Sequence, residues 1–147
     1  LCGKYTTIGA AKRAIGDEAG ARQVFEKAKA YAEEDIKQTP ADAGAHARLA
    51  KALAWLGQKE AALAEIKRAQ ELLPESKDSF EGPTITGAAA EIHGIFGNAA
   101  DAVSLLDGLL QRPSDVTVPV LKINPIWDSI RNDPRFQALL DKYGAKA

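Results

Sequence analysis

Two histidines are the first candidates in this sequence for a metal ligand or a general base. His46 and His93 each fall in the apolar register of a stretch with helical periodicity, and no cysteine or cluster of carboxylates stands near either of them. A structural or catalytic zinc site needs three or four protein ligands close together. We therefore expect both imidazoles to pack in or beside a helical core rather than to form a site.

Other catalytic arrangements are not found in the sequence. Cys2 is the single cysteine, so it can form neither an internal disulfide nor a cysteine-based metal cluster. No serine, histidine and acid are arranged as a nucleophile with its base, and the glycines are spaced as turn residues rather than as a phosphate-binding loop. We predict that the chain is not an enzyme and that it binds no cofactor or metal ion.

Length and composition predict one helical domain. The 147 residues are enough for a hydrophobic core, and the 46% of hydrophobic residues are rich in alanine and leucine, which favour helices. A net charge of −1 gives no electrostatic reason to expect a nucleic acid as partner. No apolar run is as long as a membrane span, so we expect no membrane insertion.

The start of the chain leaves its origin and compartment open. It begins at Leu1 and contains no methionine, so we expect a fragment or a processed form of a longer protein. No signal peptide is visible, but a fragment can have lost the targeting signal of its parent. We therefore assign no compartment and take the cytoplasm as the default.

A repeated spacing organises most of the chain. In three segments a turn glycine is followed after five residues by alanine, after four more by a large apolar residue, and after three more by another apolar residue. The three sets are Gly16, Ala21, Phe25 and Ala28; Gly57, Ala62, Ile66 and Ala69; and Gly97, Ala102, Leu106 and Leu109. Glycine permits the backbone turn between two helices, and alanine lets antiparallel helices approach closely. We infer three helical hairpins.

The predicted helices follow from these turns and from the prolines. They span 3–15, 18–37, 40–56, 58–73, 83–96 and 98–111, which with the tail gives about 70% helix, about twice the usual share. Pro40 and Pro83 stand in predicted first turns, where the missing N–H costs nothing. Residues 74–83 form a polar linker. The β-branched run 116–121 is interrupted by Pro119, so we predict no strand.

The tail differs from the hairpins. Asn124-Pro125 and Asp133-Pro134 each join a capping side chain to a first-turn proline, which predicts short helices at 125–131 and 134–143. An array of hairpins must cover its last apolar face. We therefore interpret the tail as a two-helix cap, and we expect Trp127 and Phe136 to pack within the cap rather than to bind a ligand.

The middle unit resembles a tetratricopeptide repeat, whose pattern is Trp-x2-Leu-Gly-x2-Tyr, then Ala-x3-Phe, then Pro. The matching positions are His46, Leu49, Ala50, Leu53, Gly57, Ala62, Ile66, Ala69 and Pro74, with weaker counterparts at Tyr5, Ile8, Gly9, Lys12, Ala21 and Phe25, and at Thr86, Ala89, Ala90, His93, Ala102 and Leu106. The glycine spacing exceeds the roughly 34 residues of the family, so longer helices or loops must absorb the difference.

The resemblance implies an all-α fold, a helical-hairpin solenoid forming a right-handed superhelix. Residues 1–112 would hold three hairpins, at 3–37, 40–73 and 83–111, and residues 113–147 would hold the linker and cap of the same domain. The segment 121–144 is also similar to the closing segment of bacterial multidomain proteins that end in such repeats. That similarity implies the C-terminal module of a larger signalling or regulatory protein.

In the family that the chain resembles, the first helix of each hairpin lines an inner groove that holds an extended peptide. The corresponding candidates here are Arg13, Arg48, Lys51, Trp55 and Glu91. Arg48 and Lys51 are three residues apart and Trp55 is four further on, so we place them on one exposed helix face beside a half-buried indole. Two cations beside an indole suit an acidic peptide or a free C-terminus, although asparagine, used by some members of the family to clamp a carboxylate, is missing from these helices.

We therefore predict a protein-interaction or scaffolding module that binds a partner peptide or protein in the groove. The alternative is a non-catalytic structural or regulatory appendage that self-associates or packs on an N-terminal enzymatic domain.

Overall fold

The computed structural model describes residues 2–144, with side chains from residue 4 onward, so the thiol of Cys2 lies outside the described part. The described chain is all-helical, with eight α-helices, no strand and 74% helix, as predicted. Its α-helices are α1 (Cys2–Ala14), α2 (Glu18–Gln38), α3 (Ala43–Trp55), α4 (Lys59–Leu72), α5 (Gly82–Ile95), α6 (Ala99–Leu110), α7 (Val118–Ile123) and α8 (Pro134–Gly144). None of these helices is both long enough and apolar enough to cross a bilayer.

Three glycines close the hairpins, as the repeated spacing predicts. Gly16, Gly57 and Gly97 have φ angles of +84°, +78° and +73°, and they are the positive-φ residues of the described chain. A residue with a side chain rarely adopts this conformation, so glycine is needed at each turn. Every predicted end of the six hairpin helices lies within one residue of the observed end, except the start of α3.

The start of α3 corrects one prediction. Pro40 was placed in the first helical turn, but α3 begins at Ala43, and Pro40 lies in the preceding turn. The side chain of Asp42 accepts a hydrogen bond from the Ala45 N–H at 2.9 Å, so it is the N-cap. A carboxylate that satisfies an otherwise unpaired N–H fixes a helix start more strongly than a proline that merely tolerates one.

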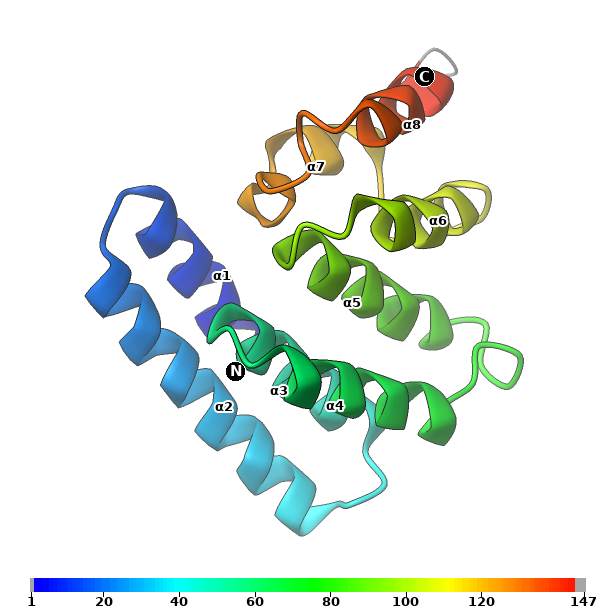
Figure 1. Cartoon of the computed structure of the whole chain (residues 1–147). Helices are drawn as coiled ribbons and strands as arrows, with labels where there is room; N and C mark the ends of the chain where they lie inside the picture. Colours follow the sequence, from blue (N-terminus) through cyan, green and yellow to red (C-terminus); the bar gives the residue numbers. More distant parts are fainter. Residues whose placement is uncertain (1, 145–147) are drawn as a thin grey trace.

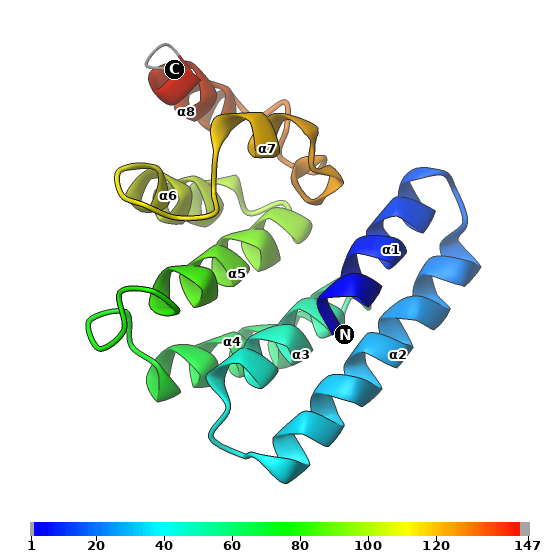
Figure 2. The same cartoon turned by 180° about the vertical axis from the view of Figure 1, so that it is seen from behind.

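The hairpins pack one on the next (Figures 1 and 2). Helix α3 contacts both helices of the first hairpin, and α5 contacts both helices of the second. The repeated alanines Ala21, Ala62 and Ala102 are completely buried. The large apolar residues that follow them, Phe25, Ile66 and Leu106, are also buried, which confirms the register.

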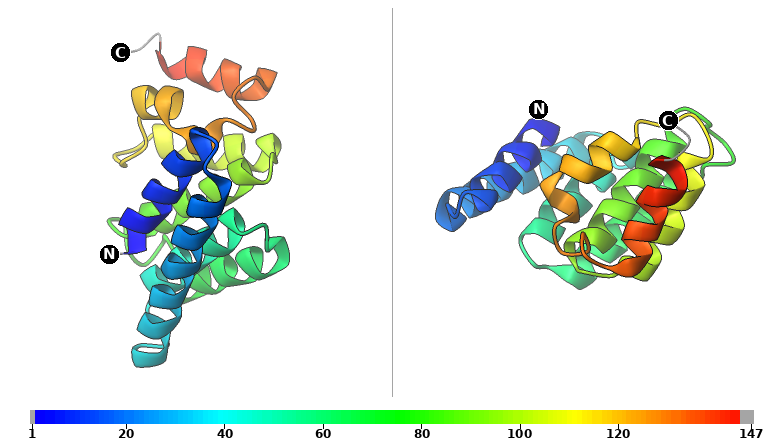
Figure 3. Two further views of the ribbon diagram at one scale, coloured as in Figure 1. Left: turned by 90° about the vertical axis from the view of Figure 1, so that its left-hand side faces the viewer. Right: turned by 90° about the horizontal axis from the view of Figure 1, so that it is seen from above.

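The cap has more elements than predicted. Helix α7 was missed, because its residues are β-branched and include Pro119, yet this proline stands in the first turn of α7, where it is tolerated. The predicted helix 125–131 is a single 3-10 turn, η1 (Pro125–Trp127), whereas α8 matches its prediction closely. Helix α8 packs on α6 (Figure 3), and the rings of Trp127 and Phe136 stack within the cap with centroids 6.0 Å apart.

Candidate interaction surface

The predicted groove residues lie on the first helix of successive hairpins: Arg13 on α1, Arg48, Lys51 and Trp55 on α3, and Glu91 on α5. Lys51 forms an ion pair with Glu91. Both side chains are about a quarter exposed, at 24% and 23%, so the pair is partly shielded from water. It joins α3 to α5 across the boundary between the second and third hairpins.

Arg48 does not join Lys51 in one cationic site. One of its terminal nitrogens lies 3.2 Å from Asp35 Oδ2 and 3.6 Å from Asp42 Oδ2, so the guanidinium is directed to the end of α2 and the loop before α3. The spacing of three residues places Arg48 and Lys51 on neighbouring parts of α3, but their acidic partners draw them in different directions. Both cations form ion pairs within the chain, so neither is the unpaired charge that the sequence suggested.

Trp55 is more deeply buried than the half-buried indole we expected. It is 8% exposed, and its ring lies parallel to that of Phe25 with centroids 5.3 Å apart. The Arg13 guanidinium lies 5.3 Å from the Phe25 centroid and 5.4 Å from the Trp55 centroid, in the range of cation–π contacts. Its Nη2 donates to the Trp55 carbonyl at 3.3 Å, and its Nε donates to Glu18 at 3.1 Å. The indole N–H has no hydrogen-bond partner among the described residues.

A hollow of about 300 Å³ adjoins this cluster. It is lined by Arg13, Glu18, Ala19, Arg22, Trp55 and Leu56. Arg22 is exposed and has no ion pair among the described residues, so this hollow carries two guanidinium groups against one carboxylate. Arg22 is not among the predicted groove residues, because it lies on α2, the second helix of its hairpin, and the prediction uses the first helices alone.

The two histidines lie in different surroundings. His46 is 8% exposed, with Nδ1 2.6 Å from Glu65 Oε2 and Nε2 3.0 Å from the Pro40 carbonyl oxygen. It therefore joins α3 to α4 and to the preceding loop, which confirms its packing role. His93 is partly exposed, and its Nδ1 lies 3.8 Å from Asp101. No group of three or more possible metal ligands occurs among the described residues.

A larger, more apolar hollow of about 720 Å³ lies in the cap. It is lined by Leu110, Gln111, Val116, Thr117, Val118, Pro119, Lys142 and Tyr143. Two of these lining residues bind Asp107 of α6, whose carboxylate accepts hydrogen bonds from Lys142 Nζ at 2.7 Å and from the Tyr143 hydroxyl at 2.9 Å. These bonds hold the pKa of the Asp107 carboxyl below its usual value. The contacts fasten the end of α8 to α6.

Comparisons with protein-family models, with curated proteins and with solved structures found no match to this chain. The resemblance to the tetratricopeptide repeat therefore depends on the residue pattern alone.

Proposed function

We propose that this chain is a non-catalytic protein-interaction module, built as a solenoid of three tetratricopeptide-like hairpins, with its partner on the face formed by α1, α3 and α5. The order of helix contacts supports this arrangement, because α3 and α5 each pack on both helices of the preceding hairpin. The repeated glycine and alanine positions support it as well. In such an array the first helices lie side by side along one surface.

The observation that carries the proposal is the ion pair between Lys51 and Glu91. It lies between the first helices of two successive hairpins, and each side chain keeps about a quarter of its surface in solvent. A partner carboxylate can replace Glu91 at Lys51, while a partner donor pairs with the released Glu91. Arg13 on α1 and Arg22 on α2, which line the hollow beside Trp55, favour a partner that is acidic or that offers its free C-terminus.

The experiment is selection of peptides from a display library, followed by calorimetry on the selected peptide. We expect Lys51→Met to lower the affinity by about tenfold, which corresponds to about 1.4 kcal/mol. The matched control is Lys67→Met, the same substitution on the exposed side of α4, which should leave the affinity unchanged. Raising the salt concentration should weaken binding without abolishing it, because exposed charges are screened more than apolar contacts. Equal affinity of the two variants would exclude this face.

A second candidate function is self-association through the first hairpin. Ile15 is 82% exposed, and Ile8 and Tyr31 are also exposed on the same hairpin. They lie on α1, on the turn after it and on α2, so the exposed apolar side chains of this hairpin offer a surface that a second copy can cover. Sedimentation equilibrium checks this candidate: a mass that rises with concentration, and that returns to the monomer value in Ile15→Ser, would favour it over peptide binding.

A further inference from the structure

The turn η1 touches helices from opposite ends of the hairpin array. It contacts α5 in the third hairpin and α1 in the first, although α1 lies more than a hundred residues earlier in the chain. Figures 1 and 2 show this turn between the two helices. A cap that only covered the last hairpin would have no contact with α1.

Two adjacent residues of the turn pack against the neighbouring clusters. Trp127 is buried in the cap core. Ile126 packs against this cap core and also against the apolar cluster formed by Ala10, Ala21, Phe25 and Trp55, which we call the Trp55 cluster. Ile95 of α5 packs against the same cluster, so side chains of the first hairpin, the third hairpin and the cap meet at Trp55.

The turn lies close to the backbone of α5. A β-carbon at Gly94 would lie 2.9 Å from two ring atoms of Trp127, so a side chain at this position would push the turn away. Glycine therefore permits an approach that no larger residue would allow. The position of Trp127 against α5 fixes how far Ile126 reaches toward α1.

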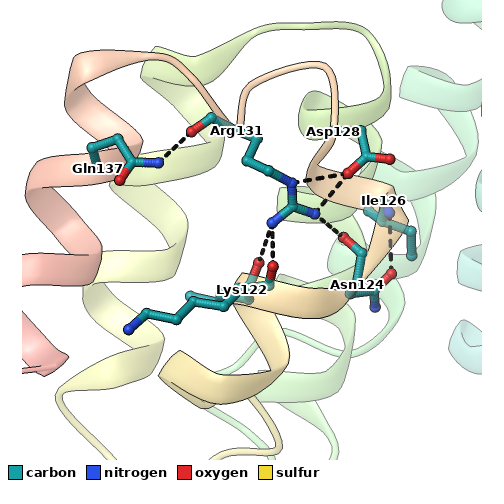
Figure 4. Close-up of polar contacts among 7 residues, drawn as sticks. Lys122, Asn124, Ile126, Asp128, Arg131 and Gln137 are labelled. Carbon is teal, nitrogen blue, oxygen red and sulfur yellow. Dashed lines mark hydrogen bonds and ion pairs between the residues drawn. The ribbon is translucent and has the colours of Figure 1, made fainter.

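Arg131 holds the shape of the turn (Figure 4). Its guanidinium donates to the carbonyl oxygens of Lys122 and Asn124, the latter at 2.8 Å, and to Asp128 Oδ1 at 2.7 and 3.0 Å. The side chain of Asn124 accepts from the Ile126 N–H at 3.1 Å. Backbone carbonyls and a carboxylate around one planar cation restrict the segment to a single conformation. The turn is thus a rigid support that presents Ile126 to the first hairpin.

We propose that the Trp55 cluster is a binding site for a branched aliphatic side chain, which Ile126 of this chain fills as a latch between the cap and the first hairpin. Ile126 is only half-buried, so its own contribution is smaller than that of a fully buried isoleucine, and the latch can open. The first hairpin then stays attached through the packing of α2 on α3, while α1 separates from η1. A partner segment with a branched aliphatic residue would compete with Ile126 for this site; this last step rests on the proposed function.

The latch is tested without any partner, by distance measurements between spin labels. One pair joins α2 to α8, at Glu26→Cys and Asp141→Cys, and a second pair joins α4 to α8, at Lys67→Cys and Asp141→Cys; Cys2 is replaced by serine throughout. All three labelled positions are exposed. In Ile126→Ser we expect the α2–α8 distances to become longer and broader while the α4–α8 distances stay unchanged, since Trp127 still holds the cap on α5 and α6.

The matched control is Ile123→Ser, the same substitution three residues earlier at a side chain that is 79% exposed. It should change neither distribution. Ile126→Val, which removes one methylene, should give a smaller change of the same kind and keeps the test available if the serine variant does not fold. If the α2–α8 distances are unchanged in Ile126→Ser and in Ile126→Val, the proposal is overturned. A change in both label pairs would overturn it too, because Ile126 would then hold the cap itself rather than the first hairpin.

The competition step has its own readout. For a peptide selected on the wild-type protein through an apolar residue, Ile126→Ser should bind more tightly than Ile123→Ser, because the site no longer has to be vacated. If Ile126→Ser shows the distance change but binds the peptide no more tightly than Ile123→Ser, the latch exists and the competition step is wrong. Failure to select any peptide would count against the proposed function and not against the latch.

Discussion

The ring of Trp55 lies on the ring of Phe25 with an interplanar angle of 1°. Trp55 ends α3 and Phe25 lies in the first half of α2, so this stack joins the first two hairpins at the point where α3 turns into α4. Arg13 covers both rings from α1. An aromatic residue that the sequence analysis placed in a binding groove is therefore a packing centre of the array.

This packing predicts a large loss of stability in Trp55→Ala. Truncation of a buried aromatic residue removes its apolar contacts and leaves a cavity, which typically costs about 3–5 kcal/mol. Urea denaturation followed by circular dichroism measures the change. A loss below about 0.5 kcal/mol, the range of surface substitutions, would mean that the indole is not buried in solution.

Ala62→Leu should destabilise the protein by about 1–3 kcal/mol through overpacking. Ala62 is completely buried where α4 packs on α3, so a larger side chain has no space. Ala61→Leu is the matched control, because Ala61 is the neighbouring exposed residue of the same helix. Thermal unfolding of both variants decides the matter: equal melting temperatures would show that the repeat register places the wrong alanine in the helix contact.

The hairpins could be predicted because their signals are local and steric. A glycine such as Gly57 is required by the backbone of its own turn, and an alanine such as Ala62 is required by the approach of the next helix. The cap was predicted less well. The residues around Pro119 have a composition typical of an extended segment, and their helical state depends on Leu121 packing into the cap core.

The candidate groove was the hardest part to predict. Helix spacing places Arg48 and Lys51 on neighbouring parts of one surface, but it does not say which acids face them. Asp35 lies near the end of α2 in the first hairpin, and Glu91 lies on α5 in the third. These pairings with residues of α3 therefore arise only from tertiary packing. The helix spacing alone places Arg48 and Lys51 on an exposed face, where substitution by glutamate costs little. In the folded protein the same substitutions would place glutamates beside existing carboxylates.

Asp133 should make stability depend on pH in the acid range. Hydrogen bonds from the side chain and backbone of Arg135 lower the pKa of the Asp133 carboxyl from 3.8 to about 2. The folded state thus holds the charged form more strongly than the unfolded state does. This contribution is present above the unfolded pKa of 3.8 and is lost as the pH falls toward 2.

The measurement is urea denaturation of Asp133→Asn and the wild type at neutral pH and at the acid end of that window. We expect the variant to be less stable at neutral pH and the difference to shrink as the pH falls. Asp141→Asn, which removes an exposed carboxylate of α8, the helix that Asp133 directly precedes, is the control. A difference between wild type and Asp133→Asn that does not vary with pH would contradict the assignment of the carboxylate.

Removal of the cap should expose apolar surface. Residues from 118 onward contribute Leu121, Trp127, Ile130, Phe136, Leu139 and Leu140 to a core shared with α5 and α6. Without them Leu106 and Ala102 lose their cover, so the truncated chain should aggregate or lose cooperative unfolding. Light scattering and urea denaturation test this. A soluble truncated chain with the wild-type midpoint would show that the tail is an independent appendage.

The ion pair between Lys51 and Glu91 offers the sharpest test of the arrangement of hairpins, because the two residues are far apart in sequence and belong to different hairpins. Lys51→Glu sets two carboxylates against each other in a partly shielded position, and Glu91→Lys does the same with two ammonium groups. Each single variant should therefore be destabilised, whereas the double variant restores an opposite pair in reversed order. The double-mutant cycle should give a coupling of about 0.5–3 kcal/mol, as contacting residues do. Two additive losses would mean that α3 and α5 do not face each other at this point, and the shared surface proposed for the partner would then not exist.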